Sequence, residues 1–212
     1  MNLKGFIFDL DGTLLNTIPT CLVAFRKSFQ INLGRDYSDR EIIALFGPTE
    51  EGIFKKLLPD RWQDGLKEYL SEYQRLERGK SPFPGIIESL SLLKEKQLHL
   101  AIVSGKGPAS MAISLKESGL RPYFETVVTG SEHGAEKPVY IRELLKNWKV
   151  APEAVAYVGD TVYDIKAAKE VGLLPIGALW AATAEVEQVQ AAHPLVSFTD
   201  AMAFKEWIEI TV

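Results

Sequence analysis

The stretch "FIFDLDGTLL", residues 6–15, carries the pattern that decides the fold. It runs from apolar residues into two aspartates, Asp9 and Asp11, and then returns to apolar residues. A carboxylate that enters an apolar interior without compensation costs several kcal/mol or takes up a proton. We therefore expect a cation or a set of hydrogen-bond donors where this buried strand ends.

The same apolar pattern returns along the chain, which indicates a sheet of several strands. Helical patterns lie between the apolar runs, with apolar residues three or four positions apart, as at Ile86, Leu90 and Leu93. This alternation predicts an α/β fold, in which helices cover a doubly wound, Rossmann-like parallel sheet. The later strand-like runs are "LHLAIVS", "ETVVTG", "AVAYVG", "LPIGAL" and a weaker "PLVSF".

A long insertion separates the first strand from the second. About 80 residues lie between "FDLDG" and "LHLAIVS", far more than one crossover helix needs. Residues 17–80 contain helical patterns only, and "SPFPG" closes this segment as a linker. We predict an α/β core formed by residues 1–16 and 81–212, with an inserted all-helical cap domain at residues 17–80.

The composition argues against several classes of partner. The net charge is -4 and no run of lysine and arginine occurs, so we expect no nucleic acid partner. The single cysteine, Cys21, cannot form an internal disulfide, which favours a reducing compartment. The N-terminus lacks the unbroken apolar core of a signal peptide, and no apolar run reaches the roughly 20 residues of a membrane-spanning helix. We expect a cytoplasmic protein without a membrane segment, and the sequence leaves its oligomeric state open.

Groups that bind anions follow the first two strands. Gly12 and Thr13 come directly after the aspartates, in a turn whose backbone amides face whatever the carboxylates bind. The second strand ends at Ser104, and Gly105 leads into "KGPAS", where Pro108 suits the first turn of a helix. A hydroxyl and free amides at a helix N-terminus form an anion site.

Two further charged motifs stand at predicted element boundaries. Lys137 precedes Pro138 at the entrance of a helix, where a positive charge gains nothing from the helix dipole, so an anionic partner would explain it. The run "VAYVGDTVYD" delivers Asp160 at a strand end and Asp164 one helical turn later. Ligands in open α/β sheets bind at the carboxyl ends of the strands, so we expect the two carboxylate pairs to face one another.

The charge balance of this predicted site calls for a metal. Four carboxylates and one lysine leave an excess of negative charge, most of which a divalent cation would remove. Oxygen ligands favour Mg²⁺ over zinc, because the chain offers one cysteine and three scattered histidines, His99, His133 and His193.

With these motifs in this order, "DLDGT", Ser104, Lys137 and "GDTVYD", the whole chain resembles the haloacid dehalogenase superfamily, in its phosphatase branch with a helical cap. The nearest branch is similar to phosphoglycolate phosphatase and related hydrolases, judged also from "FGPTEEGIF" in the cap. The resemblance implies that Asp9 is the nucleophile and Asp11 the acid/base. The residues expected at the phosphoryl group are Thr13, Ser104, Gly105 and Lys137.

The resemblance also implies the cofactor and the reaction. Asp9, Asp11 through its carbonyl, and Asp160 would bind Mg²⁺, with Asp164 in support. The reaction would be hydrolysis of a small phosphomonoester through a phospho-aspartate intermediate.

Other functions stay open at this point. A β-phosphoglucomutase-like isomerase shares the nucleophile, acid/base and cap, and differs in tending to carry an acidic residue where this chain has the glycine of "GDT". A phospho-acceptor signalling protein without turnover also combines acids, Mg²⁺, a hydroxyl and a lysine, but receiver domains are about half this length. A dehalogenase would need neither Asp11 as acid nor a metal.

The predicted cap loop bears on the substrate. It supplies Glu50 and Glu51 but no arginine, so an acidic leaving group such as glycolate would need Lys55, Lys56 or a backbone amide. Neutral sugar or polyol phosphates are therefore rival substrates.

Overall fold

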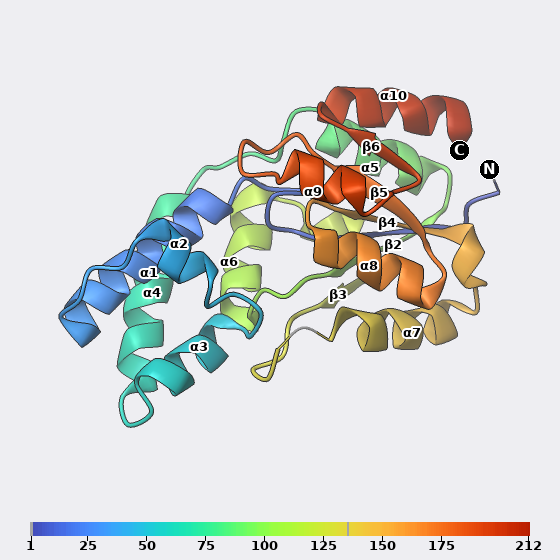
Figure 1. Cartoon of the computed structure of the whole chain (residues 1–212). Helices are drawn as coiled ribbons and strands as arrows, with labels where there is room; N and C mark the ends of the chain where they lie inside the picture. Colours follow the sequence, from blue (N-terminus) through green and yellow to red (C-terminus); the bar gives the residue numbers. More distant parts are fainter. Residues whose placement is uncertain (1, 135) are drawn as a thin grey trace.

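The computed structural model describes residues 2–134 and 136–212. Over these residues the α/β prediction is confirmed: the strands form a six-stranded parallel sheet in the order β3-β2-β1-β4-β5-β6 (Figure 1). Each strand-like run of the sequence forms one strand. The strands are β1 (Gly5–Phe8), β2 (His99–Val103), β3 (Thr126–Val128), β4 (Val155–Gly159), β5 (Leu174–Ala178) and β6 (Val196–Phe198).

Helices cover both faces of the sheet because successive strand residues point to opposite sides. Phe6 and Phe8 pack with residues of α5, α6 and α10, whereas Ile7 packs with residues of α7 and α8. These helices and their neighbours are α5 (Ile86–Glu95), α6 (Pro108–Ser118), α7 (Lys137–Trp148), α8 (Val162–Val171), α9 (Val186–Ala191) and α10 (Ala201–Thr211). None of the helices within the described residues combines the length and apolar character needed to cross a membrane.

Four helices between β1 and α5 lie together beside one end of the sheet (Figure 1). They are α1 (Ile18–Leu33), α2 (Asp39–Ile43), α3 (Glu50–Leu57) and α4 (Trp62–Glu77), which we call the α1–α4 segment. The segment has its own aromatic core, in which the Phe25 and Tyr69 rings lie 4.4 Å apart. A Cβ atom at Gly65 would lie 2.6 Å from the Phe54 ring, so glycine allows α3 and α4 to approach closely.

The strand order brings two aspartate-bearing strand ends together. β1 lies between β2 and β4, and the direction of winding reverses there, which is where ligands bind in open α/β sheets. β1 ends at Phe8, so Asp9 and Asp11 lie beyond the regular strand rather than on it. Gly12 follows with a φ of 79°, and a Cβ atom there would lie 2.2 Å from an Asp160 carboxylate oxygen. This glycine therefore permits the close approach of the two strand ends.

Candidate active site

A cavity of about 400 Å³ lies between the carboxyl ends of the strands and the α1–α4 segment. Its core side holds the charged and small groups, and its other side holds mainly apolar groups. The core-side lining residues are Asp9, Asp11, Ser104, Gly105, Lys106, Lys137, Asp160, Thr161 and Tyr163. The structure thus brings most of the sequence-predicted site residues to one cavity.

Three carboxylates gather beside this cavity, and two of them, Asp9 and Asp160, line it. Asp9, Asp160 and Asp164 are buried, and one oxygen of each lies within 4.8 Å of the others. Burial raises the pKa of the Asp9 carboxyl to about 6, although Lys137 opposes the rise. Burial, together with the charges of Asp164 and Asp9, raises the pKa of Asp160 well above its usual range. The cluster therefore carries more negative charge than its protein partners offset.

Lys137 is the cation of this cluster. It occupies the first position of α7, as its place before Pro138 predicts, and it is 7% exposed. Its Nζ atom donates to Asp9 Oδ1 at 2.8 Å and to Asp164 Oδ1 at 2.6 Å. Burial alone would lower the pKa of Lys137, but Asp164 and Asp9 raise it well above its usual value. The anionic partner expected for this lysine is thus a pair of carboxylates.

Asp164 has structural partners as well. Its Oδ2 atom accepts bonds from the backbone and hydroxyl of Thr161, which closes a capping box at the start of α8. Its Oδ1 atom accepts from the Tyr157 hydroxyl at 3.1 Å. Because both oxygens are already engaged, Asp164 is suited to orient the cluster rather than to provide a free ligand atom.

The cluster fits a hard divalent cation. It offers carboxylate oxygens only, which Mg²⁺ prefers, and neither histidine nor cysteine joins the group among the described residues. The raised pKa values of Asp9 and Asp160 point the same way, because a bound cation would stabilise both ionised carboxylates.

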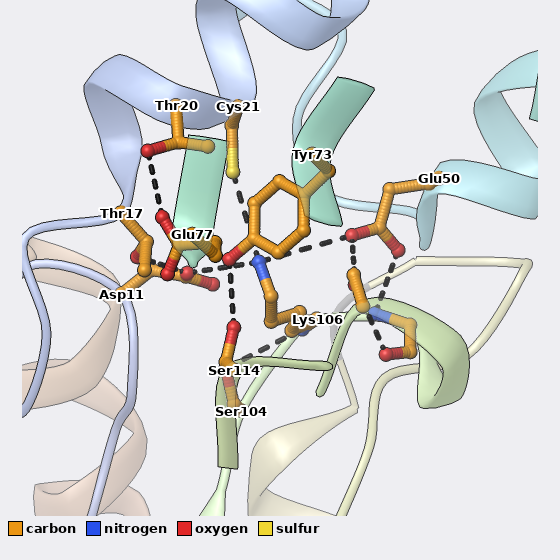
Figure 2. Close-up of polar contacts among 12 residues, drawn as sticks. Asp11, Thr17, Thr20, Cys21, Glu50, Tyr73, Glu77, Ser104, Lys106 and Ser114 are labelled. Atoms are coloured by element: carbon orange, nitrogen blue, oxygen red, sulfur yellow. Dashed lines mark hydrogen bonds and ion pairs between the residues drawn. The ribbon is translucent and has the colours of Figure 1, made fainter. Parts of the chain in front are cut away.

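The Asp11 carboxylate lies outside this three-carboxylate group and has different partners (Figure 2). Its Oδ1 atom accepts from Lys106 Nζ at 3.0 Å and from the Thr17 hydroxyl. Both donors contact the same oxygen. The structure therefore separates the two aspartates of "DLDGT": Asp9 joins the acidic cluster, and the Asp11 side chain joins Lys106.

Lys106 is a charged site residue that the sequence analysis did not predict. Its side chain is 1% exposed, and Figure 2 shows it between Asp11 and Glu50, beside the Tyr73 ring. The Nζ atom lies 4.4 Å from the centre of that ring and 4.0 Å from Glu50 Oε1. Burial alone would lower the pKa of Lys106, but Asp11 foremost raises it well above its usual value. The signal was available in "SGKG", where this lysine stands two residues after Ser104.

The other predicted phosphate-binding residues differ in their positions. Ser104 is 2% exposed at the end of β2 and lines the cavity with Gly105, just before α6. The Thr13 side chain is fully buried, and its hydroxyl donates to Asp160 Oδ1 at 3.2 Å. Thr13 thus contacts the acidic cluster and is not among the cavity-lining residues.

The predicted cap loop also differs from expectation. Lys55, considered above as a partner for an acidic leaving group, binds Glu51 and Glu132 and lies over the Trp62 ring. Neither it nor Lys56 is among the cavity-lining residues. Glu50 does line the cavity: its carboxylate accepts from the Gly107 backbone at 2.7 Å and from the Ser110 hydroxyl. A carboxylate, rather than a lysine, therefore reaches the cavity from α3.

Comparisons with known proteins identify the family of this chain. Residues 6–178 match the family model described as haloacid dehalogenase-like hydrolase. A protein named "Probable phosphatase IndB" from Dickeya dadantii is 32% identical over 201 residues, 90% of this chain and 86% of that protein. A phosphoglycolate phosphatase from Synechococcus elongatus is 31% identical over 187 residues, 84% of each chain. The crystal structure of a predicted phosphoglycolate phosphatase from Haemophilus somnus superimposes with a TM-score of 0.80 at 20% identity, covering 97% of this chain and 98% of that one. The chain therefore belongs to the haloacid dehalogenase-like hydrolase family.

Proposed function

We propose that this protein is a Mg²⁺-dependent phosphatase that hydrolyses a small phosphomonoester through a phospho-aspartate on Asp9. The observation that carries the proposal is the cavity itself, where buried Asp9 pairs with Lys137 and belongs to a carboxylate cluster suited to Mg²⁺. Asp11 borders the same cavity with one oxygen held by Lys106 and Thr17. Relatives named as phosphatases support the same activity.

In the first step a carboxylate oxygen of Asp9 attacks phosphorus, and the bond from phosphorus to the ester oxygen breaks. Asp11 gives its proton to the departing oxygen, while Lys137 and Ser104 hold the oxygens of the phosphoryl group. In the second step water attacks phosphorus, Asp11 takes up the proton, and inorganic phosphate leaves Asp9. Mg²⁺ bound by Asp9, the Asp11 carbonyl and Asp160 would offset charge on the phosphoryl oxygens. With Asp11 ionised, a divalent cation together with Lys106 and Lys137 would balance the charge of the four aspartates.

We also propose that residues 17–80 act as a cap over a core of residues 1–16 and 81–212. The two connections of the segment lie together, since the Phe83 backbone donates to Leu14 at 3.2 Å. At the far side, the Thr49 backbone donates to Ser131 at 3.0 Å, which joins the segment to the core. Such a cap would exclude water from the reacting groups and open to release products.

The substrate is a small phosphate ester, with phosphoglycolate-like compounds and sugar phosphates as the candidate groups. The size of the cavity supports a compact molecule and argues against a protein or nucleic acid chain.

Phosphate release from a panel of these esters tests the proposal. With Mg²⁺ we expect turnover, with excess chelator we expect none, and Asp9→Asn should lose at least about 10³-fold because an amide is a poor nucleophile. Asp36→Asn, an exposed aspartate of the α1–α4 segment, is the matched control and should keep full activity. Mass spectrometry of acid-quenched protein should detect a phosphoryl group on the native chain and none on Asp9→Asn.

Three results would contradict the proposal. Full activity in chelator or in Asp9→Asn would contradict a Mg²⁺-dependent mechanism with Asp9 as the nucleophile. A stable phospho-protein without turnover would favour a phospho-acceptor, and conversion of sugar phosphates into positional isomers with little free phosphate would favour an isomerase.

A further inference from the structure

We propose that the part of the cavity beyond Asp11, which we call the leaving-group pocket, selects phosphate esters of uncharged alcohols with an apolar surface, and that Glu50 disfavours anionic leaving groups. This inference rests on the proposed phosphatase function and names the substrate class within it. Of the two candidate groups of substrates, it favours esters of neutral alcohols over phosphoglycolate, because phosphoglycolate carries a carboxylate at this end and a neutral alcohol does not.

The wall of the leaving-group pocket is apolar and comes from the α1–α4 segment. Phe25, Phe46, Ile53 and Tyr69 line it, and the rings of Phe25 and Phe46 lie 6.1 Å apart. Burial raises the pKa of the Tyr69 hydroxyl well above its usual value, so this group remains neutral. Burial likewise raises the pKa of the neighbouring Cys21 thiol to about 12. Such a surface gains free energy by covering carbon rather than a charged group.

No cation of the α1–α4 segment, all of which is described, reaches this pocket to receive an anion. Lys106 from the core is the cation on this side, and it is already within 3.0 Å of Asp11 and 4.0 Å of Glu50. A carboxylate entering here would meet the fixed Glu50 carboxylate and a lysine that is already shared between Glu50 and Asp11. Repulsion between like charges is strong in a cavity from which water is excluded, so an anionic leaving group is disfavoured.

Glu50 is held firmly enough to exert this effect. Its side chain is 9% exposed, and both oxygens accept hydrogen bonds from the first turn of α6, from Gly107 and Ser110. A Cβ atom at Gly107 would lie 2.2 Å from Glu50 Oε2, so the glycine admits this contact. These two hydrogen bonds therefore keep the Glu50 carboxylate in the cavity while the α1–α4 segment is in contact with α6.

Matched esters separate this inference from the proposed function. Phosphoglycolate and hydroxyethyl phosphate have the same number of chain atoms up to the terminal carbon, and they differ mainly in a carboxylate against a hydroxymethyl group. We expect kcat/KM for hydroxyethyl phosphate to exceed that for phosphoglycolate by at least about 10-fold, and kcat/KM for propyl and benzyl phosphate to be higher again. Each reaction is followed by phosphate release with Mg²⁺.

Glu50→Gln tests the assigned residue, because glutamine keeps the shape and an acceptor but loses the charge. It should raise the ratio of kcat/KM for phosphoglycolate to kcat/KM for propyl phosphate by about 10-fold. Glu51→Gln is the matched control, since Glu51 stands next in α3, pairs with Lys55 and does not line the cavity. Its selectivity should equal that of the native chain.

The outcomes are distinct. If the native chain prefers phosphoglycolate, the inference is overturned while the phosphatase function stands. Unchanged selectivity in a folded Glu50→Gln overturns the role of Glu50, and if that variant does not fold, the native ester series alone decides. If no ester releases phosphate with Mg²⁺, the proposed function fails and the inference fails with it.

Discussion

The two ends of the cavity hold their charges in different ways. At the phosphoryl end, Lys137 and its carboxylates all come from the core, and their bonds are 2.6 and 2.8 Å long. At the other end, Lys106 reaches from the core toward Asp11 and toward Glu50 of α3, in a wall that is otherwise mostly apolar. The contrast fits our proposals that residues at the strand ends carry out the chemistry and that the α1–α4 segment selects the leaving group.

Removing the lysine of the phosphoryl end should have the largest effect. Lys137→Met leaves Asp9 and the fully buried Asp164 without their cation. With Mg²⁺ present, we expect phosphate release to fall by about 10²–10³-fold. In chelator, we expect the free energy of unfolding to fall by about 3–5 kcal/mol. Urea unfolding with and without Mg²⁺ measures the second effect, and Mg²⁺ should restore part of the stability. If Lys137→Met keeps more than about a tenth of the native activity, Lys137 does not contribute more to catalysis than Lys106, and the comparison of the two ends fails.

Removing the lysine at the other end should have an intermediate effect. Lys106→Met keeps the stem beside Tyr73 and removes the charge that orients Asp11. Thr17 still holds Asp11 Oδ1, so we expect kcat to fall by about 10–100-fold rather than more. Stability should fall less than in Lys137→Met, because the Asp11 side chain is 17% exposed and can be hydrated. Lys55→Met, a lysine outside the cavity, is the control. A loss of stability larger than that of Lys137→Met would reverse the comparison.

Removing the ion pairs that Glu72 forms within the α1–α4 segment should have the smallest effect. Its hydrogen bond with Arg75, assisted by Lys27, lowers the pKa of the Glu72 carboxyl to about 2. A lowered pKa stabilises the fold above the unfolded value of about 4.5, and this stability is lost as the pH falls toward 2. Glu72→Gln should therefore cost about 1 kcal/mol at pH 7, since both cationic partners are well exposed, and should flatten the pH dependence of unfolding below pH 4.5.

Urea unfolding of the native chain and of Glu72→Gln between pH 7 and pH 3 measures this effect. Equal pH dependence of unfolding in both chains would show that the ion pairs of Glu72 do not stabilise the fold. Catalytic rates at pH 7 should be the same in both chains. A change in selectivity would mean that α4 shapes the leaving-group pocket more directly than its contacts indicate.

The phosphoryl end could be predicted from the sequence because each of its residues follows a strand or opens a helix. Once the strands were aligned in parallel, Asp9, Asp160 and Lys137 had to meet at one edge. The leaving-group end could not be predicted in this way. Its side chains come from α1, α3, α4 and the loop before α3, whose packing the local pattern does not specify. Lys106 looks like an ordinary loop lysine until Tyr73 covers it. For the same reason the sequence could not show that Lys55, a candidate partner for an acidic leaving group, pairs with Glu132.

The central place of β1 has a consequence for the synthesis of the protein. Its neighbours β2 and β4 pair with it from positions about 90 and 150 residues later in the chain. At roughly 5–20 residues per second, the ribosome needs about 5–20 s to deliver the first neighbour and about 8–30 s to deliver the second. Phe6, Ile7 and Phe8, fully buried in the finished sheet, remain unpaired during that interval. The topology therefore exposes these three apolar residues to contacts outside the sheet until β2 and β4 have been synthesised.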